Sequence, residues 1–360
     1  MARLLWLHLC QGYGGAERLT EALVPALARE HELLFLTNHP ELFALEGLTP
    51  CPFPGPAFFS SPAAAWHQIQ ALRALLRPGD QVLAVMHYGA FLATLAARLK
   101  RPRPRVVSAL HGPIRPALWT VLRPQRRPLL LAARLLIRLS DTLIVPSHGL
   151  KQELVVSFGQ PRHRVVVVPN GLPPWSETPK TPRGPKDPLR LLWMGRLAPE
   201  KAPERVLYAL AELKDLPWHL TLLGQGAEEA RLRKLAEDLG LTPRLQWPGF
   251  QKDVRPFLQE ADIFLHTCLF EGFGLSILEA MACGCAVVAE DCPYGPREVL
   301  DHGRYGTLVN SLAGLKEALH RLLTRKDLLQ EAQERARQRA RDFPLSRTLK
   351  GYQEVLKKGP

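Results

Sequence analysis

Two glutamates eight positions apart, Glu271 and Glu279, are the most informative residues of this 360-residue chain. An apolar run over 263–268 predicts a buried strand before them, and Glu279 should lie one turn into the following helix. In open α/β sheets such strand ends bind ligands. Gly272 and Gly274 let backbone approach a phosphate, and carboxylates accept strong hydrogen bonds from sugar hydroxyls. The segment suits a sugar nucleotide, although the pair could also be a loop residue and a solvated helix residue.

The pair resembles the Glu-x7-Glu motif of family-4 retaining glycosyltransferases, and the next residues, Ala280 to Ala289, are similar to that family too. The resemblance implies transfer of a sugar from a nucleotide-diphosphate donor, with a UDP-sugar favoured, to a hydroxyl of a membrane-associated glycan or lipid-linked acceptor. Glu279 would bind the ribose, and Glu271 would bind the transferred sugar. The donor diphosphate would lie against the backbone of Gly272, Phe273, Gly274 and Leu275.

A second loop, Gly195 to Lys201, resembles the family's phosphate-binding segment and contributes Arg196 and Lys201. Two cations there would neutralise the charge on a departing diphosphate, a role that otherwise needs a metal ion. No two aspartates are separated by a single residue, so the sequence lacks a metal–diphosphate clamp of the Asp-x-Asp type. We therefore expect no metal and no cofactor.

The run Gly12 to Glu17 follows the first predicted strand and opens a helix. It differs from a dinucleotide fingerprint because Glu17 replaces the third glycine and no acidic residue ends the second strand. It resembles the first loop of family-4 glycosyltransferases, which implies that Gly14 and Gly15 face the donor diphosphate and the acceptor. A purely structural tight turn is the alternative.

Three further residues stand beside predicted strand or helix ends. His111 follows the strand over 105–110, and the resemblance implies that it contacts the donor sugar at the reacting centre. Asn170 follows the strand over 164–168 and should line the cleft or the hinge. Glu298, at a helix start, could reach the sugar or nucleotide, or only complement the helix dipole.

Strand and helix patterns alternate along both halves of the chain, which predicts parallel sheets covered on both faces. The expected fold is α/β, with two Rossmann-like domains facing across a cleft (the GT-B architecture) and a C-terminal helix that crosses back to the N-terminal domain. We expect an acceptor-binding domain over 1–170 with helix 345–360, a proline-rich linker over 171–188, and a nucleotide-sugar-binding domain over 189–344. The expected strands cover 3–9, 32–37, 81–87, 105–110, 142–146, 164–168, 190–194, 219–223, 245–247, 263–268, 286–289 and 307–309.

The formal net charge of +13 is concentrated in one stretch. No acidic residue occurs between Arg98 and Arg138, where basic residues alternate with apolar ones. Such a stretch suits an anionic membrane surface; a solvated basic face and a nucleic-acid patch are the alternatives. No nucleic-acid-binding signature accompanies it, and we expect no nucleic-acid partner. The basic residues are Arg98, Lys100, Arg101, Arg103, Arg105, Arg115, Arg123, Arg126, Arg127, Arg134 and Arg138.

No apolar run reaches the 18 or more residues of a membrane span. The six cysteines lack metal-ligand spacing, so we expect buried thiols in a reducing compartment rather than disulfides or a metal site. We therefore expect a cytoplasmic protein, peripheral on the inner face of the cytoplasmic membrane.

Two other functions compete with a glycosyltransferase. A sugar-nucleotide 2-epimerase could share the fold, but it would need dedicated acid and base residues that the sequence does not offer. A non-enzymatic protein could use the basic stretch to bind membrane or nucleic acid.

Overall fold

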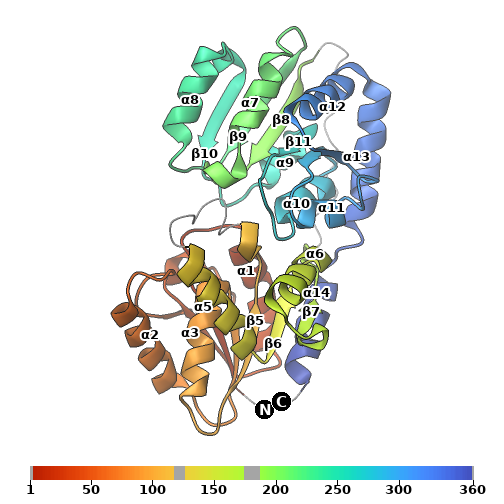
Figure 1. Ribbon diagram of the computed structural model, residues 1–360. Coiled ribbons are helices and arrows are strands. Elements are labelled where there is room, and N and C mark those ends of the chain that lie inside the picture. The colour runs from red at the N-terminus through yellow and green to blue at the C-terminus, as the bar shows by residue number, and fades with distance from the viewer. Residues whose placement is uncertain (1–2, 117–125, 174–186, 359–360) are drawn as a thin grey trace. The chain divides into compact units, whose positions relative to one another are not determined.

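The computed structural model describes residues 3–116, 126–173 and 187–358. Contacts divide the chain into two compact units (Figure 1). Unit 1 contains Met1–Pro173 together with Leu345–Pro360, and unit 2 contains Pro174–Pro344. Most of the proline-rich segment between them, 174–186, lies outside the described residues.

Unit 1 is built on a seven-stranded parallel sheet with the order β3-β2-β1-β4-β5-β6-β7. Its central strands are almost wholly apolar because helices cover both faces. The six strands expected in this half are present, and a two-residue edge strand, β3, was not predicted. The strands are β1 (Leu4–His8), β2 (Leu33–Thr37), β3 (Cys51–Pro52), β4 (Gln81–Val85), β5 (Arg105–Ala109), β6 (Thr142–Val145) and β7 (Val165–Val167).

Two helices of unit 1 start within three residues of a strand end, α3 after β4 and α6 after β6. The expected strand over 81–87 ends two residues early, because His87 already starts α3. The helices are α1 (Gly15–Ala28), α2 (Pro62–Leu75), α3 (His87–Arg98), α5 (Arg126–Leu139), α6 (His148–Gln152) and α14 (Leu345–Lys357), with short helical turns at Pro40–Leu42, Glu153–Ser157 and Arg162–Arg164.

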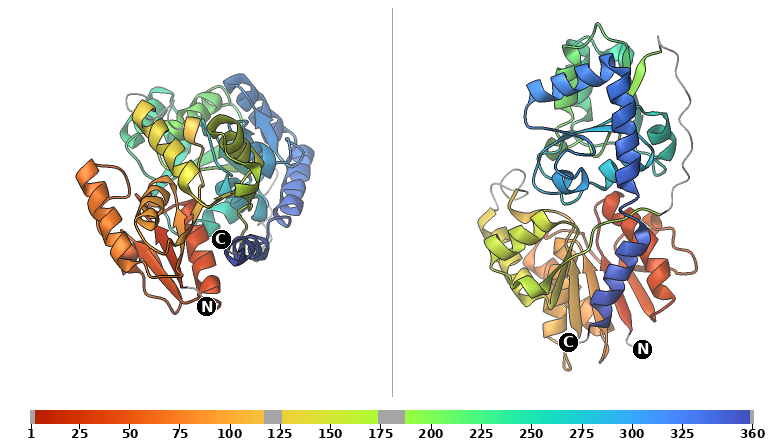
Figure 2. Two further views of the ribbon diagram at one scale, coloured as in Figure 1. Left: turned by 60° about the horizontal axis from the view of Figure 1, so that its bottom comes forward. Right: turned by 90° about the vertical axis from the view of Figure 1, so that its right-hand side faces the viewer.

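The C-terminal helix α14 is an integral part of unit 1 (Figure 2). Its Tyr352 ring stacks on that of Trp6 in β1 with centroids 6.3 Å apart, and Leu356 is 1% exposed in the same core. The guanidinium of Arg105 donates to the carbonyls of Val355 and Leu356 at 3.0 and 3.3 Å. These carbonyls have no partner within the last turn of a helix, so Arg105 caps α14.

Unit 2 carries a six-stranded parallel sheet with the order β10-β9-β8-β11-β12-β13. The strands are β8 (Leu189–Met194), β9 (Trp218–Leu223), β10 (Leu245–Gly249), β11 (Ile263–His266), β12 (Ala286–Glu290) and β13 (Thr307–Val309). The helices are α7 (Glu204–Ala211), α8 (Glu229–Asp238), α9 (Arg255–Glu260), α10 (Leu275–Ala282), α11 (Gly295–Val299), α12 (Leu312–Thr324) and α13 (Lys326–Ala340), with short turns η5 (Pro199–Lys201) and η6 (Thr242–Arg244).

Two parallel α/β sheets, with the last helix returned to the first unit, confirm the predicted fold class. Within the described ranges, no helix is both long enough and apolar enough to cross a membrane.

The return of α14 yields a stability prediction. Leu356→Ala should lower the free energy of unfolding by about 2–5 kcal/mol, because it leaves a cavity in the core of unit 1. Lys357→Ala, one position along and exposed, should change it by less than about 0.5 kcal/mol. Urea unfolding of both variants measures the difference. Equal midpoints would show that α14 contributes little to unit 1.

Candidate functional site

The candidate site of unit 2 lies where the strand order of its sheet reverses. The first strand of the unit, β8, has β9 and β10 on one side and β11 to β13 on the other. The loops that follow β8 and β11 therefore both start at the carboxyl ends of the parallel strands and run in opposite directions from there. Ligands of open α/β sheets bind at such a switch point.

An ion pair joins these two loops. Lys201 ends η5 after β8, and its Nζ lies 2.7 Å from Oε2 of Glu271, which follows β11. The two side chains are 22% and 21% exposed. Below them the Thr267 hydroxyl donates to the Lys201 carbonyl at 3.0 Å and accepts from the Trp193 indole at 3.0 Å. The structure thus brings together two of the predicted site residues.

The charges of the pair support one another. Burial disfavours a charged Glu271, but Lys201 and His266 outweigh it and hold the pKa of this carboxyl well below its usual range. Burial likewise disfavours a charged Lys201, but its contacts with Cys268 and with the Glu271 carboxylate outweigh burial and raise the pKa of the ammonium. Both groups are therefore charged at neutral pH.

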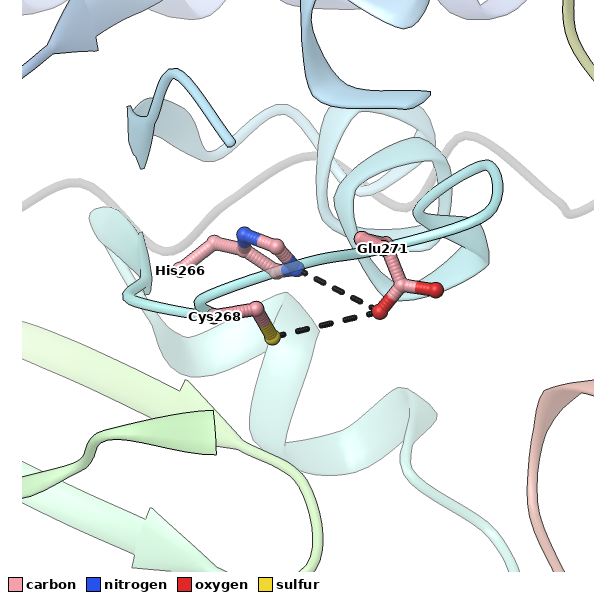
Figure 3. A group of neighbouring side chains, drawn as sticks. All are labelled: His266, Cys268 and Glu271. Carbon is pink, nitrogen blue, oxygen red and sulfur yellow. Dashed lines mark hydrogen bonds and ion pairs between the residues drawn. The ribbon is translucent and has the colours of Figure 1, made fainter. Parts of the chain in front are cut away.

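His266 and Cys268 adjoin the same carboxylate. His266 Nε2 lies 3.7 Å from Glu271 Oε2, and Cys268 Sγ lies 3.9 Å from it (Figure 3). Burial lowers the pKa of His266, but its contacts with Cys268 and with the Glu271 carboxylate outweigh burial and raise this pKa to about 9. Sequence analysis missed His266. Its position as a polar residue at the end of an apolar strand could have identified it as a candidate site residue.

The turn after Glu271 needs its glycines. Gly274 has a φ of +96° and precedes the first residue of α10, and a Cβ there would lie 3.0 Å from the Ile277 side chain. Gly295 lies against the same turn, and a Cβ on it would lie 2.2 Å from the carbonyl oxygen of Phe273. The first N–H groups of a helix lack partners within it, so the start of α10 at Leu275 offers donors to an anion.

Backbone hydrogen bonds fix Glu271 in position. Its N–H donates to the Pro293 carbonyl at 2.7 Å, and its own carbonyl accepts from the N–H groups of Tyr294 and Gly295 at 2.7 and 3.0 Å. The turn after β12 therefore holds the turn after β11. Gly272 donates its N–H to Glu271 Oε1 at 3.1 Å.

Glu279, Arg196 and Glu298 differ in their surroundings. Glu279 is 1% exposed in α10, so the alternative of a solvated helix residue is wrong. The Arg196 side chain is 66% exposed and donates to Glu200 at 3.0 Å, so the structure does not bring it to Glu271. Glu298 lies in α11, where its carbonyl accepts from Arg339 at 2.8 Å.

A second group of candidate residues lies at the sheet edge of unit 1. His8 ends β1, while His87 and His111 each stand two residues beyond the adjacent strands β4 and β5. The His8 ring contacts Glu17 Oε1 at 3.1 Å and Thr20 Oγ1 at 2.8 Å. Sequence analysis selected only His111 from this group, although His8 lies within the strand predicted over 3–9 and His87 is the last residue of the strand predicted over 81–87.

His87 and His111 are neutral at physiological pH. Burial lowers the pKa of His111 to about 4, and burial also lowers that of His87 to about 4. His111 Nδ1 and His87 Nε2 are buried and have no hydrogen-bond partner among the described residues. A neutral imidazole in this state can bind a hydroxyl without adding charge. Gly14 and Gly15 stand at the start of α1, and a Cβ on Gly14 would lie 3.4 Å from Oε2 of Glu17, the partner of His8.

Asn170 lies in unit 1 beside the return of α14. It is 6% exposed, and its Oδ1 finds no hydrogen-bond partner in the described part of the chain. Its neighbour Pro169 accepts a hydrogen bond at 2.8 Å from Thr348 of α14. Asn170 thus lies close to Pro173, where the first segment of unit 1 ends, and its hinge or cleft-lining role stays a prediction.

Comparison with known proteins gives two family matches that together span most of the chain. Residues 13–175 match the model described as Glycosyltransferase Family 4, and residues 176–341 match the model described as Glycosyl transferases group 1. An exopolysaccharide phosphotransferase of Streptomyces coelicolor is 32% identical over 64% of this chain and 24% of its own length. The chain spans less than half the length of the first curated relatives that it matches.

A D-inositol 3-phosphate glycosyltransferase of Streptomyces bingchenggensis is 30% identical over 77% of this chain and 67% of its own length. Other relatives have names from lipopolysaccharide biosynthesis. The crystal structure of the Anabaena protein HepE with UDP and glucose has a TM-score of 0.81 over the full length of both chains at 20% identity, which establishes the shared fold. The chain therefore belongs to the family-4 glycosyltransferases.

Proposed function

We propose that this protein is a retaining glycosyltransferase that moves a sugar from a nucleotide-diphosphate donor to a hydroxyl of a membrane-associated glycan or lipid-linked acceptor. The observation that carries the proposal is the Lys201–Glu271 ion pair, which lies at the switch point of the second sheet beside the start of α10. Family membership favours this function over a 2-epimerase or a non-enzymatic binding protein.

The pair suggests how a donor would bind. A diphosphate carries more negative charge than one carboxylate and would compete for the Lys201 ammonium. Glu271, released in part from Lys201, would then accept hydrogen bonds from the hydroxyls of the transferred sugar. Arg196 is exposed and would add a second cation once it leaves Glu200. UDP is the favoured nucleotide, and its presence in the HepE structure supports that choice.

Glu279 is the proposed ribose-binding residue. Its burial in α10 suits a carboxylate that accepts from two adjacent hydroxyls, since such bonds strengthen when water is excluded.

A front-face reaction fits these assignments, because both glutamates are occupied in binding hydroxyls. The bond between the anomeric carbon and the diphosphate oxygen breaks as the acceptor oxygen bonds to that carbon from the same face. The acceptor proton passes to the departing phosphate oxygen. Lys201, Arg196 and the N–H groups at the start of α10 would stabilise the charge on the leaving group.

Unit 1 is the proposed acceptor-binding unit. His111 is neutral, and its free Nδ1 could bind a sugar hydroxyl beside Gly14 and Gly15. Asn170 could contribute its buried amide oxygen. Glu298 in α11 is a further proposed donor contact, to the sugar or to the nucleotide.

Some arginines of the basic stretch have partners within the protein, and others are exposed on α5. Arg103 pairs with Asp141 at 2.5 Å, Arg105 caps α14, and Arg115 donates to Ser157 at 3.1 Å. Arg134 and Arg138 are exposed on α5. Arg123 lies outside the described residues. We propose that the exposed face of α5 contacts an anionic membrane on its cytoplasmic side.

The roles proposed for Glu279 and Glu271 in donor binding predict that their variants lose different properties. Glu279→Gln should weaken nucleoside-diphosphate binding by roughly 10- to 100-fold, because charged hydrogen bonds of about 1.5–3 kcal/mol disappear. Glu271→Gln should lower turnover more than nucleoside-diphosphate affinity. Calorimetric titration and transfer assays separate the two. Glu260→Gln, which changes a 67% exposed side chain in the same unit, is the control. Equal loss of affinity in both site variants would contradict the assigned roles.

Because the site has two cationic side chains, we predict that sugar transfer needs no metal ion. After dialysis against EDTA, the protein should keep most of its activity, because Lys201 and Arg196 supply the positive charge. Assays with added magnesium or manganese give the comparison. Activity that vanishes with EDTA and returns only with one of these ions would refute metal independence.

The exposed face of α5 predicts salt-sensitive membrane binding. Sedimentation should show that the protein binds anionic vesicles, binds neutral ones weakly and leaves them at high salt. Arg134→Gln combined with Arg138→Gln should weaken binding about 10-fold or more, since each arginine contributes about 1 kcal/mol. Arg321→Gln with Lys326→Gln removes the same charge from unit 2. Equal binding by both double variants would show that α5 is only a solvated face.

A further inference from the structure

Three potential metal ligands converge at the end of β11. The ligand atoms of His266, Cys268 and Glu271 all lie within 4.8 Å of one another. Figure 3 shows the imidazole and the thiol approaching the same carboxylate oxygen. All three residues come from one six-residue segment, and backbone hydrogen bonds hold Glu271 in place. The cluster is thus preformed.

The distances fit one small cation. Zinc binds nitrogen and oxygen at about 2.0–2.2 Å and sulfur at about 2.3 Å, which places tetrahedral ligand atoms about 3.3–3.7 Å apart. The carboxylate oxygen lies 3.7 Å from the nitrogen and 3.9 Å from the sulfur. The three ligand atoms lie within 4.8 Å of one another, so side-chain shifts of up to about 1 Å would complete the tetrahedral geometry. Thiolate together with imidazole selects zinc over magnesium or calcium.

The state of His266 points independently to a ligand. The residue is 3% exposed, and neither ring nitrogen has a hydrogen-bond partner among the described residues. Buried polar side chains normally have one. The contact with Glu271 at 3.7 Å is longer than a hydrogen bond. The Nε2 atom is therefore buried and directed at the carboxylate, where it forms an ion pair but no hydrogen bond.

We propose that His266, Cys268 and Glu271 bind Zn²⁺ as an inhibitory ion, with water as the fourth ligand. On binding, the thiol and the imidazolium release their protons, and zinc takes the place of Lys201 at Glu271 Oε2. Zinc and the ammonium then compete, because both are cations at one carboxylate. The inhibitory effect rests on the proposed function, in which Glu271 binds the donor sugar, whereas zinc binding itself does not.

Direct binding tests the site. Metal-free protein should remove Zn²⁺ from a chromogenic chelator with one site per chain, and Co²⁺ should give the absorption bands of a tetrahedral thiolate complex. Cys268→Ser and His266→Gln should each bind at least 10-fold more weakly. Cys51→Ser, which changes a free and partly exposed thiol in unit 1, is the matched control. Lys201→Met should bind more tightly, because it removes the competing cation.

The outcomes separate the site from the proposed function. Equal zinc affinity in wild type and both ligand variants, with all proteins folded by circular dichroism, would overturn the site. Weaker binding in Lys201→Met would overturn the competition. In transfer assays, micromolar zinc should inhibit wild type and Cys51→Ser but spare Cys268→Ser, and EDTA should reverse the inhibition. Zinc binding without any sugar transfer would reject the proposed function and leave the site intact.

Discussion

Parallel pairing of β8 with β11 is the constraint on which the candidate site depends. These strands are separated by about 70 residues, yet their register places Leu191 beside Ile263 and Trp193 beside Leu265. Because the strands are parallel, both following loops leave the same sheet edge. Lys201 and Glu271 meet there, and Thr267 joins the two loops through the Lys201 carbonyl.

Burial then makes each charge of the site depend on another. A half-buried carboxylate or ammonium alone would shift its pKa toward the neutral form. Together, Lys201 and Glu271 both stay charged. A bound diphosphate would take the Lys201 ammonium as its partner, and a bound metal ion would take the Glu271 carboxylate. The same dependence therefore underlies the proposed donor binding and the proposed inhibition by zinc.

Unit 1 differs from unit 2 in the residues that stand at the carboxyl ends of its central strands. Three histidines follow adjacent strands, and burial keeps His87 and His111 neutral, while His8 is held by Glu17 and Thr20. The unit is completed by α14, whose last carbonyls are capped by Arg105. A cation that sequence analysis counted toward a membrane-binding stretch thus stabilises the fold.

The sequence by itself determined the alternating strands and helices, the glycine turns and the Glu-x7-Glu spacing. These features are local, since apolar periodicity and backbone geometry act within about ten residues. Strand order, however, depends on contacts between distant segments. Only the tertiary structure therefore decided that Lys201 meets Glu271, that Arg196 turns to Glu200, that Glu279 is buried, and that His266 and Cys268 adjoin one carboxylate. The edge strand β3 was not predicted, because a segment of two residues is too short to show a periodic pattern.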